Sequence, residues 1–200
     1  MWKRFREETG NASLLSAEVR KNMGKEKWDV YDIHRVKTGD VVVRGTKPAQ
    51  GQFRMVVHIC IFNSKGQMLI QQRVKDKDDW ADLWDVSVGG CSRSGETSQD
   101  AAHREVSEEL GLDIDFEGVV PRFTINWEHG FDDYYVLKQD LDPATLILQP
   151  EEVQAVKWAT RDEILDLIRK DRFITYHESL INMLFEMRGG YGAHSSEKNR

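Results

Sequence analysis

The stretch GCSRSGETSQDAAHREVSEELGL occupies Gly90–Leu112 of the 200-residue chain and predicts a loop followed by a helix. Thr97 and Asp100, three residues apart, resemble a capping box at the start of a helix. Gly111 stands where a glycine commonly ends one, because glycine adopts the left-handed backbone conformation without strain. We therefore expect a helix from about Thr97 to Leu110.

Three glutamates lie on one face of this expected helix. Glu105, Glu108 and Glu109 follow the spacing i, i+3, i+4, which brings their carboxylates together. Such like charges destabilise an isolated helix by roughly a few tenths of a kcal/mol, and Arg104 offsets only part of the repulsion. A solvated charged face is the ordinary explanation of this pattern, but convergent carboxylates are also the ligands that Mg²⁺ or Mn²⁺ prefers.

The rest of the chain predicts further strands and helices around this segment. Hydrophobic patterning and turn residues predict strands at 28–33, 41–44, 55–63, 67–73, 84–87, 118–126, 134–139 and 153–158. Thr38-Gly39-Asp40 predicts a turn, and helices are expected at 161–170 and 176–188. A mixture of strands with few helices is typical of an α/β or α+β sandwich.

The fixed spacing within the quoted stretch identifies a family. Gly90 is followed by five residues, then Glu96, then seven residues, then REVSEELGL at 104–112. This arrangement resembles the Nudix box, the loop–helix–loop signature of hydrolases that act on nucleoside diphosphates linked to another group. The resemblance implies an α/β/α sandwich around a mixed β-sheet over about 53–186. It leaves 1–52 as an N-terminal extension with a β-hairpin and 187–200 as a flexible tail.

The resemblance also implies roles for the matching residues. The metal ligands would be Glu105, Glu108, Glu109 and the carbonyl of Gly90, holding Mg²⁺ or Mn²⁺. Arg104 would orient the glutamates, and Glu96 would support the metal site or the arginine. Water would attack a phosphorus of the diphosphate linkage in a nucleoside diphosphate derivative. The proton acceptor stays open between a box glutamate and an acid from another loop, and the identity of the substrate stays open as well.

Two arginines and two aromatic residues outside the box are candidates for binding that substrate. Arg54 and Arg73 carry guanidinium groups that bind phosphate well, although single arginines are more often surface or packing residues. Trp127 and Tyr134 carry rings that can stack on a base, although most aromatic residues in such segments belong to the core. For each of these candidates, a purely structural role is the alternative.

Two adjacent aspartates form a further candidate. Asp132 and Asp133 follow Gly130 in a predicted loop ahead of the expected strand 134–139. In such a loop they would supply an additional metal ligand or a base. Solvated loop charge is the equally simple alternative.

A second branch of the same family competes for the function. The segments WDVYD at 28–32, QQR at 71–73 and WD at 84–85 resemble isopentenyl-diphosphate isomerases. In the isomerase pattern a cysteine precedes the first box glutamate by seven residues, where this chain has Gly89, and a metal-binding histidine stands where this chain has Cys91. Both differences favour hydrolysis. A non-catalytic, nucleotide-sensing module is a third alternative, but such modules usually lose box glutamates.

The composition argues against two classes of partner, nucleic acids and membranes. A net charge of −6 argues against general coating of nucleic acid, and no apolar run reaches the roughly 18 residues of a membrane span. The two cysteines, Cys60 and Cys91, fit a reducing compartment. We therefore expect a cytoplasmic hydrolase with no nucleic-acid or membrane partner. Because many members of the resembled family are homodimers, a homodimer that uses the extension as its interface is also considered.

Overall fold

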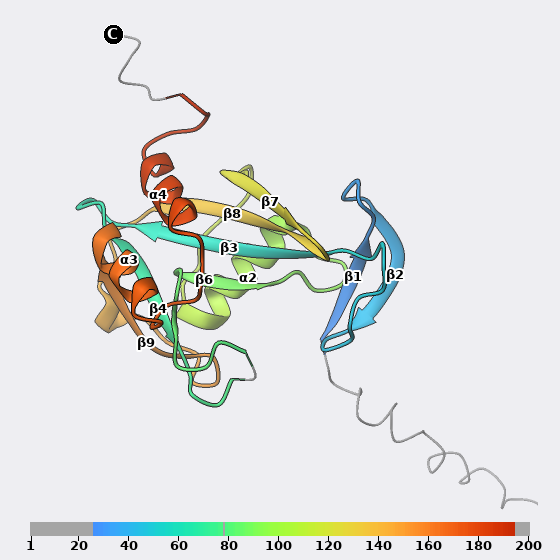
Figure 1. Ribbon diagram of the computed structural model, residues 1–200, viewed down its shortest axis with the longest axis horizontal. Helices are drawn as coiled ribbons and strands as arrows, with labels where there is room; N and C mark the ends of the chain where they lie inside the picture. The colour runs from blue at the N-terminus through green and yellow to red at the C-terminus, as the bar shows by residue number, and fades with distance from the viewer. Residues whose placement is uncertain (1–25, 78, 195–200) are drawn as a thin grey trace, which may run out of the picture.

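A computed structural model describes residues 26–77 and 79–194, and its central feature is a seven-stranded sheet (Figure 1). The strands are β3 (Arg54–Phe62), β4 (Met68–Arg73), β5 (Trp84–Asp85), β6 (Val88–Cys91), β7 (Phe123–Trp127), β8 (Gly130–Lys138) and β9 (Val153–Ala159). The main path runs β5-β4-β3-β8-β7, while β6 also pairs with β3 and β9 with β4. Strands β3 and β8 run parallel and the other pairs antiparallel, so the sheet is mixed.

Helices cover both faces of the sheet. Helix α2 (Ser98–Leu110) packs over one face, and α3 (Arg161–Arg169) and α4 (Glu178–Met187) pack over the other (Figure 1). Because successive strand residues point to opposite faces, Ile59 and Ile61 enter the α2 core while Cys60 and Phe62 enter the other. The expected α/β/α sandwich is therefore confirmed. A short 3₁₀ turn, η1 (Pro143–Thr145), precedes β9.

Local sequence determines both ends of α2, the helix that carries the box. The Thr97 hydroxyl accepts a hydrogen bond from the Asp100 N–H at 3.1 Å, and the Asp100 carboxylate accepts one from the Thr97 N–H at 2.9 Å. Gly111 has φ +66°, and a Cβ built on it would lie 2.7 Å from the Ile147 Cβ. The predicted capping box and terminal glycine are both confirmed.

A separate hairpin, β1 (Lys27–Tyr31) and β2 (Lys37–Val43), precedes the sheet. The turn predicted at 38–40 is wrong, because those residues lie inside β2. The chain turns over 32–36 instead, where the Asp32 carboxylate accepts the N–H groups of residues 34 and 36 at 2.9 Å each. Reciprocal backbone hydrogen bonds between Tyr31 and Phe53, at 2.8 and 3.0 Å, attach the hairpin to the sheet.

Other predicted boundaries are also wrong. The strand expected at 84–87 ends at Asp85, and a second strand, β6, follows it, in which Gly89 and Gly90 pair with β3. Asp132 and Asp133 lie inside β8, not in a loop, since that strand begins at Gly130. The strand expected from 118 begins at Phe123, and the helix expected from 176 begins at Glu178.

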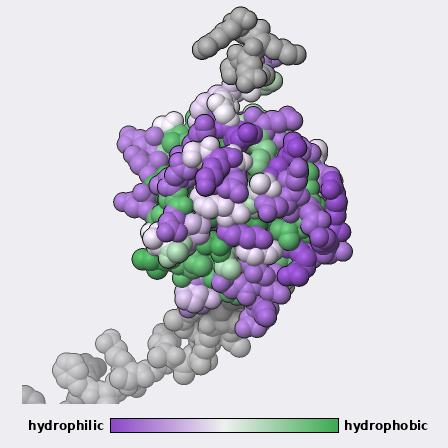
Figure 2. All heavy atoms as spheres, turned by 90° about the vertical axis from the view of Figure 1, so that its left-hand side faces the viewer, coloured by the Kyte–Doolittle hydropathy of each residue, from purple (hydrophilic) through white to green (hydrophobic). Residues whose placement is uncertain are grey.

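The remaining predictions concern the ends and the surface of the chain. Residues 1–25 and 195–200 lie outside the described residues, so the predicted extension and tail are described only in part. Figure 2 shows a mostly hydrophilic surface at the end of the molecule that carries α3, with smaller hydrophobic areas. Within 26–77 and 79–194, no helix combines the length and hydropathy needed to cross a bilayer.

Candidate active site

Arg104 gathers the box carboxylates around one guanidinium group. Its Nε and Nη2 donate to the two oxygens of Glu96 at 2.6 and 2.9 Å. Its Nη1 lies 2.7 Å from Glu105 Oε1 and donates to Glu108 Oε2 at 3.2 Å. Nη2 also donates to the Cys91 carbonyl at 3.1 Å. The arginine thus ties the box loop, α2 and β6 together, as its expected orienting role requires.

Two residues that sequence reasoning missed complete this network. Arg93 donates to both oxygens of Glu108 at 2.9 and 3.0 Å, and its Nε donates to Glu26 at 2.6 Å. The Arg93 N–H donates to Glu96 at 2.7 Å. Arg93 was visible within the box loop, but Glu26 lies 67 residues earlier and only the fold brings it here.

Glu105 and Glu109 are buried beneath the sheet, with 9 % and 4 % of their surfaces exposed. Burial raises the pKa of Glu105 to about 7, although the Arg104 charge acts in the opposite direction. Burial and the charge of Glu105 hold the pKa of Glu109 well above its usual range, with smaller contributions from Glu152 and Asp85. Glu105 therefore has Arg104 as its one counter-charge, while Glu109 forms no ion pair with a described residue that would balance it when ionised.

Two neighbours shape the space around these buried carboxylates. The Gln71 side-chain amide, another residue that sequence reasoning missed as a site residue, donates to Glu109 Oε2 at 2.9 Å. A Cβ built on Gly90 would overlap the Glu105 carboxylate. Glycine at position 90 therefore lets the helix carboxylate approach the β6 backbone directly, next to the Gly90 carbonyl.

This donor set fits a hard divalent cation. Buried carboxylates and a backbone carbonyl are oxygen ligands, and a cation would balance the charge that burial leaves uncompensated. In the described ranges no three Asp, Glu, His or Cys side chains converge on one ion position, and Glu108 instead contacts Arg93 and Arg104. Binding by all three glutamates requires Glu108 to exchange Arg93 for the cation.

The comparison with known families agrees with the box. The NUDIX domain family model matches residues 52–178, and those residues include the whole loop–helix–loop stretch. The chain belongs to the Nudix family. A Nudix hydrolase of Listeria monocytogenes is 43 % identical over 169 residues, covering 84 % of this chain and 99 % of the relative. The chain is accordingly a hydrolase that acts on pyrophosphate bonds.

Other relatives of this Nudix protein include both structures and isomerases. A crystal structure of a Deinococcus radiodurans protein has a TM-score of 0.65 and 25 % identity, covering 80 % of this chain and 99 % of that one. An isopentenyl-diphosphate Delta-isomerase of Serratia proteamaculans is 34 % identical over 125 residues, covering 58 % of this chain and 67 % of the relative. The relatives therefore include both hydrolases and isomerases, the two branches of the family that the sequence resembles.

The two candidate aspartates of β8 point to opposite faces of the Nudix sheet. Asp133 is 1 % exposed, and its oxygens accept hydrogen bonds from Arg35, Ser98 and Thr124 at 2.6 to 3.0 Å. It joins the hairpin to α2 and has no free oxygen for a ligand role. Asp132 lies on the other face, where it accepts from Trp127 Nε1 at 2.8 Å and lies 3.6 Å from His58 Nε2.

The remaining candidates divide between core, surface and site. Tyr134 is 2 % exposed and stacks between His58 and Phe123, with ring centroids 4.6 and 4.9 Å away, so it belongs to the core. Arg73 lies on β4, and both its Nε and its Nη2 donate to the Asp79 carbonyl at 3.3 Å. Arg54 and Trp127 do come together, with the guanidinium 5.1 Å from the ring centroid.

We predict that the stability of the metal-free protein falls as pH rises from about 5 to 8. A carboxyl group whose folded pKa is raised stabilises the fold below its unfolded pKa and loses that contribution as pH rises through the folded value. Glu105, raised from 4.5 to about 7, alone corresponds to roughly 3 kcal/mol.

Differential scanning fluorimetry in EDTA across this pH range measures the effect. Saturating Mg²⁺ should raise Tm most at pH 8 and flatten the profile, because a cation bound to the folded state stabilises it. A Tm that is constant with pH in EDTA, or a Mg²⁺ shift that is equal at pH 5 and pH 8, would contradict the carboxylate assignment.

Proposed function

We propose that this protein is a divalent-metal-dependent hydrolase that cleaves the diphosphate linkage of a nucleoside diphosphate derivative by attack of water on phosphorus. The observation that carries the proposal is the pair of buried carboxylates: Glu105 lies against Gly90 and pairs with Arg104, and Glu109 pairs with no described cation. Burying such a pair destabilises the fold. The same pair provides oxygen ligands for a Mg²⁺ or Mn²⁺ ion, which would in turn bind a diphosphate.

The residues of the box have different roles in the proposed reaction. Glu105, Glu108, Glu109 and the Gly90 carbonyl would hold the cation, which when bound lowers the pKa of water and neutralises charge on the diphosphate. Arg104 is a positioning residue, since it fixes the directions of Glu105 and Glu108. Glu96 positions Arg104 in turn through two hydrogen bonds at 2.6 and 2.9 Å.

The geometry at Gly89 and Cys91 supports hydrolysis over isomerisation. A Cβ at Gly89 would lie 3.3 Å from His58 Nδ1, so a cysteine there would press on the histidine ring. Burial raises the pKa of the Cys91 thiol to about 11, so that it stays protonated at neutral pH and cannot act as a base. Neither position therefore offers the acid–base group of the isomerase pattern.

A product assay tests this proposal against its rival. The purified protein is incubated with Mg²⁺ or Mn²⁺ and a panel of nucleoside di- and triphosphates, ADP-ribose-type compounds and isopentenyl diphosphate. We expect metal-dependent cleavage of at least one nucleotide class into two phosphorylated products or into a nucleotide and phosphate. Rearrangement of isopentenyl diphosphate without phosphate release would contradict hydrolysis. Nucleotide binding without any turnover would favour the sensing module.

Two further expectations accompany this proposal. We infer a cytoplasmic location from the cysteine usage of the sequence, and fractionation of the source cells tests it. We also retain the homodimer as a proposal, which light scattering of the full chain tests by its mass against 23.2 kDa for one chain.

A further inference from the structure

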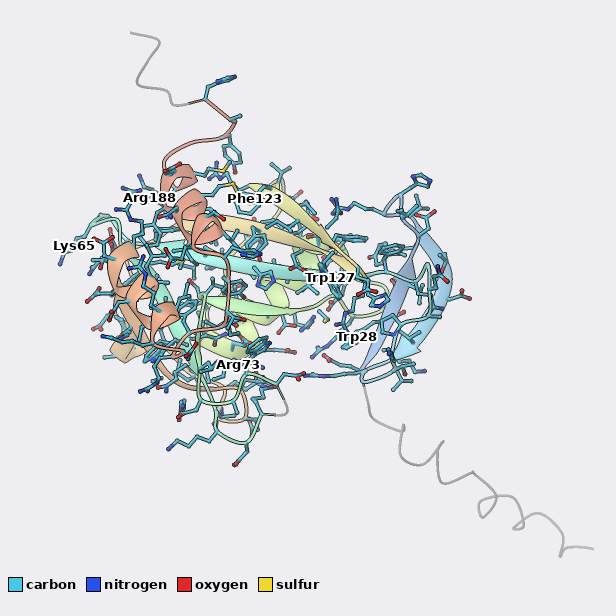
Figure 3. All side chains as sticks on the ribbon, viewed as in Figure 1. Trp28, Lys65, Arg73, Phe123, Trp127 and Arg188 are labelled. Atoms are coloured by element: carbon cyan, nitrogen blue, oxygen red, sulfur yellow. The ribbon has the colours of Figure 1, made fainter. Side chains whose placement is uncertain are left out.

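Arg54, at the start of β3, lies between two indole rings. Its guanidinium carbon is 5.2 Å from the ring centroid of Trp28 and 5.1 Å from that of Trp127. Trp28 comes from β1 and Trp127 from β7, and Figure 3 shows them close together where the hairpin meets the ends of β7 and β8. Two aromatic contacts hold a planar guanidinium in a fixed orientation. We call these three residues the arginine clamp.

Gly130, at the start of β8, packs closely against the clamp. A Cβ built on Gly130 would lie 2.7 Å from the Trp127 ring and 2.5 Å from the Arg54 carbonyl oxygen. Glycine at the start of β8 therefore leaves room for both the Trp127 ring and the β3 backbone at this point. Asp132 fixes the same ring through the hydrogen bond from Trp127 Nε1 at 2.8 Å.

The positive charge of Arg54 has no counterpart in the described part of the chain. The other arginines near the site pair with carboxylates: Arg35 with Asp133, Arg44 with Glu26, and Arg93 and Arg104 with Glu108. Arg54 forms no ion pair with any described residue, and its Nε is buried without a hydrogen-bond partner. Arg54 is only partly buried, and its two Nη groups make no hydrogen bond to a described residue.

The clamp lies on the sheet face that carries Asp132, opposite α2, whereas Glu105 lies over Gly90 on the α2 face. Val56 of β3 pairs with Cys91 and Val57 with Gly90, so Arg54 begins about 10 Å along β3 from the position of Glu105. The charges of Arg54 and Glu105 both reach Cys91, acting on its pKa in opposite directions. A substrate with two linked phosphates and a sugar is long enough to span this distance, and it would reach both groups past the edge of β6 that pairs with no described strand.

We propose that the arginine clamp binds phosphate oxygens of the substrate, with the Nη groups of Arg54 donating while Trp28 and Trp127 hold its plane. This inference rests on the proposed hydrolase function, because it places the diphosphate between the clamp and the box glutamates. A planar fork of N–H donors matches phosphate oxygens in pairs, which a single ammonium group does not. Trp28 then gives the N-terminal hairpin a direct part in the substrate site.

Calorimetric titration with inorganic pyrophosphate in Mg²⁺ tests the clamp without requiring turnover. We expect Arg54→Gln to raise the dissociation constant by about tenfold or more, because charge-assisted hydrogen bonds are lost. Arg54→Lys keeps the charge without the planar fork, so its affinity should fall between those of the wild type and Arg54→Gln. Arg161→Gln, on exposed α3, is the matched control and should bind as the wild type does.

The outcomes separate the clamp from the proposed function. Binding by Arg54→Gln within twofold of the wild type, with an unchanged circular dichroism spectrum, would overturn the clamp. Failure of the wild-type protein to bind pyrophosphate at all would do the same. If pyrophosphate binding depends on Arg54 but the wild type hydrolyses no nucleotide in the product panel, the clamp stands and the proposed function fails.

Discussion

Glu109→Gln is expected to reduce hydrolysis by at least about a hundredfold while the protein stays folded, since it removes an essential oxygen ligand. Glu109 is 4 % exposed, and ionising it in the fold is unfavourable because of burial and the nearby charge of Glu105. The neutral amide removes that penalty, so Tm in EDTA at pH 8 should rise by a few degrees. Loss of activity together with gained stability is the signature of a binding residue that strains the fold.

The matched control for this variant is Glu186→Gln, an exposed position in α4. Turnover assays and Tm in EDTA and in Mg²⁺ are measured on both variants. The control should match the wild type in each measurement, and Glu109→Gln should also lose the Mg²⁺-dependent rise in Tm. Near-normal turnover by Glu109→Gln would contradict the metal assignment.

Arg104→Gln is expected to lower the free energy of unfolding by about 3 kcal/mol, because it leaves buried carboxylates without their cation. For a chain of this size, that corresponds to a fall in Tm of roughly 6–12 °C. The guanidinium now contacts Glu96, Glu105 and Glu108, so their directions are lost together. We also expect a fall in kcat of about tenfold to a hundredfold, as for other residues that orient metal ligands.

Chemical denaturation with Arg169→Gln as the control tests this prediction. Arg169 also binds a glutamate through two hydrogen bonds of 2.8 Å, but this pair with Glu178 is exposed. Its loss should change stability by less than about 1 kcal/mol. Equal effects of the two substitutions would show that burial of the Arg104 network contributes nothing to stability.

Local signals in the sequence predicted the box helix well, because its ends depend on neighbouring residues. Thr97 and Asp100 form the capping box in the first turn, and Gly111 directly follows the last turn. Short-range signals of this kind identify the boundaries of the helix. The i, i+3, i+4 spacing likewise placed three glutamates on one side of α2. It did not reveal that Glu105 and Glu109 are buried while Glu108 turns outward to Arg93.

Contacts between distant segments were the part that the sequence could not provide. Asp133 looked like a loop acid, yet its position in β8 buries it against Arg35 of the hairpin. Gly89 and Gly90 are unfavourable in a strand by propensity, but close approach of the helix carboxylate requires a glycine at position 90. The clamp depends on residues of three strands, so no single spacing could have indicated it.

Isotope labelling tests the central claim, water attack on phosphorus at the box carboxylates, most directly. The reaction of the best substrate in the panel is run in H₂¹⁸O, and the products are analysed by mass spectrometry. We predict one ¹⁸O atom in one phosphorylated product for each cleavage, with Glu109→Gln forming labelled product at least about a hundredfold more slowly. Products without ¹⁸O on phosphorus, or equal labelling rates for wild type and variant, would contradict the account.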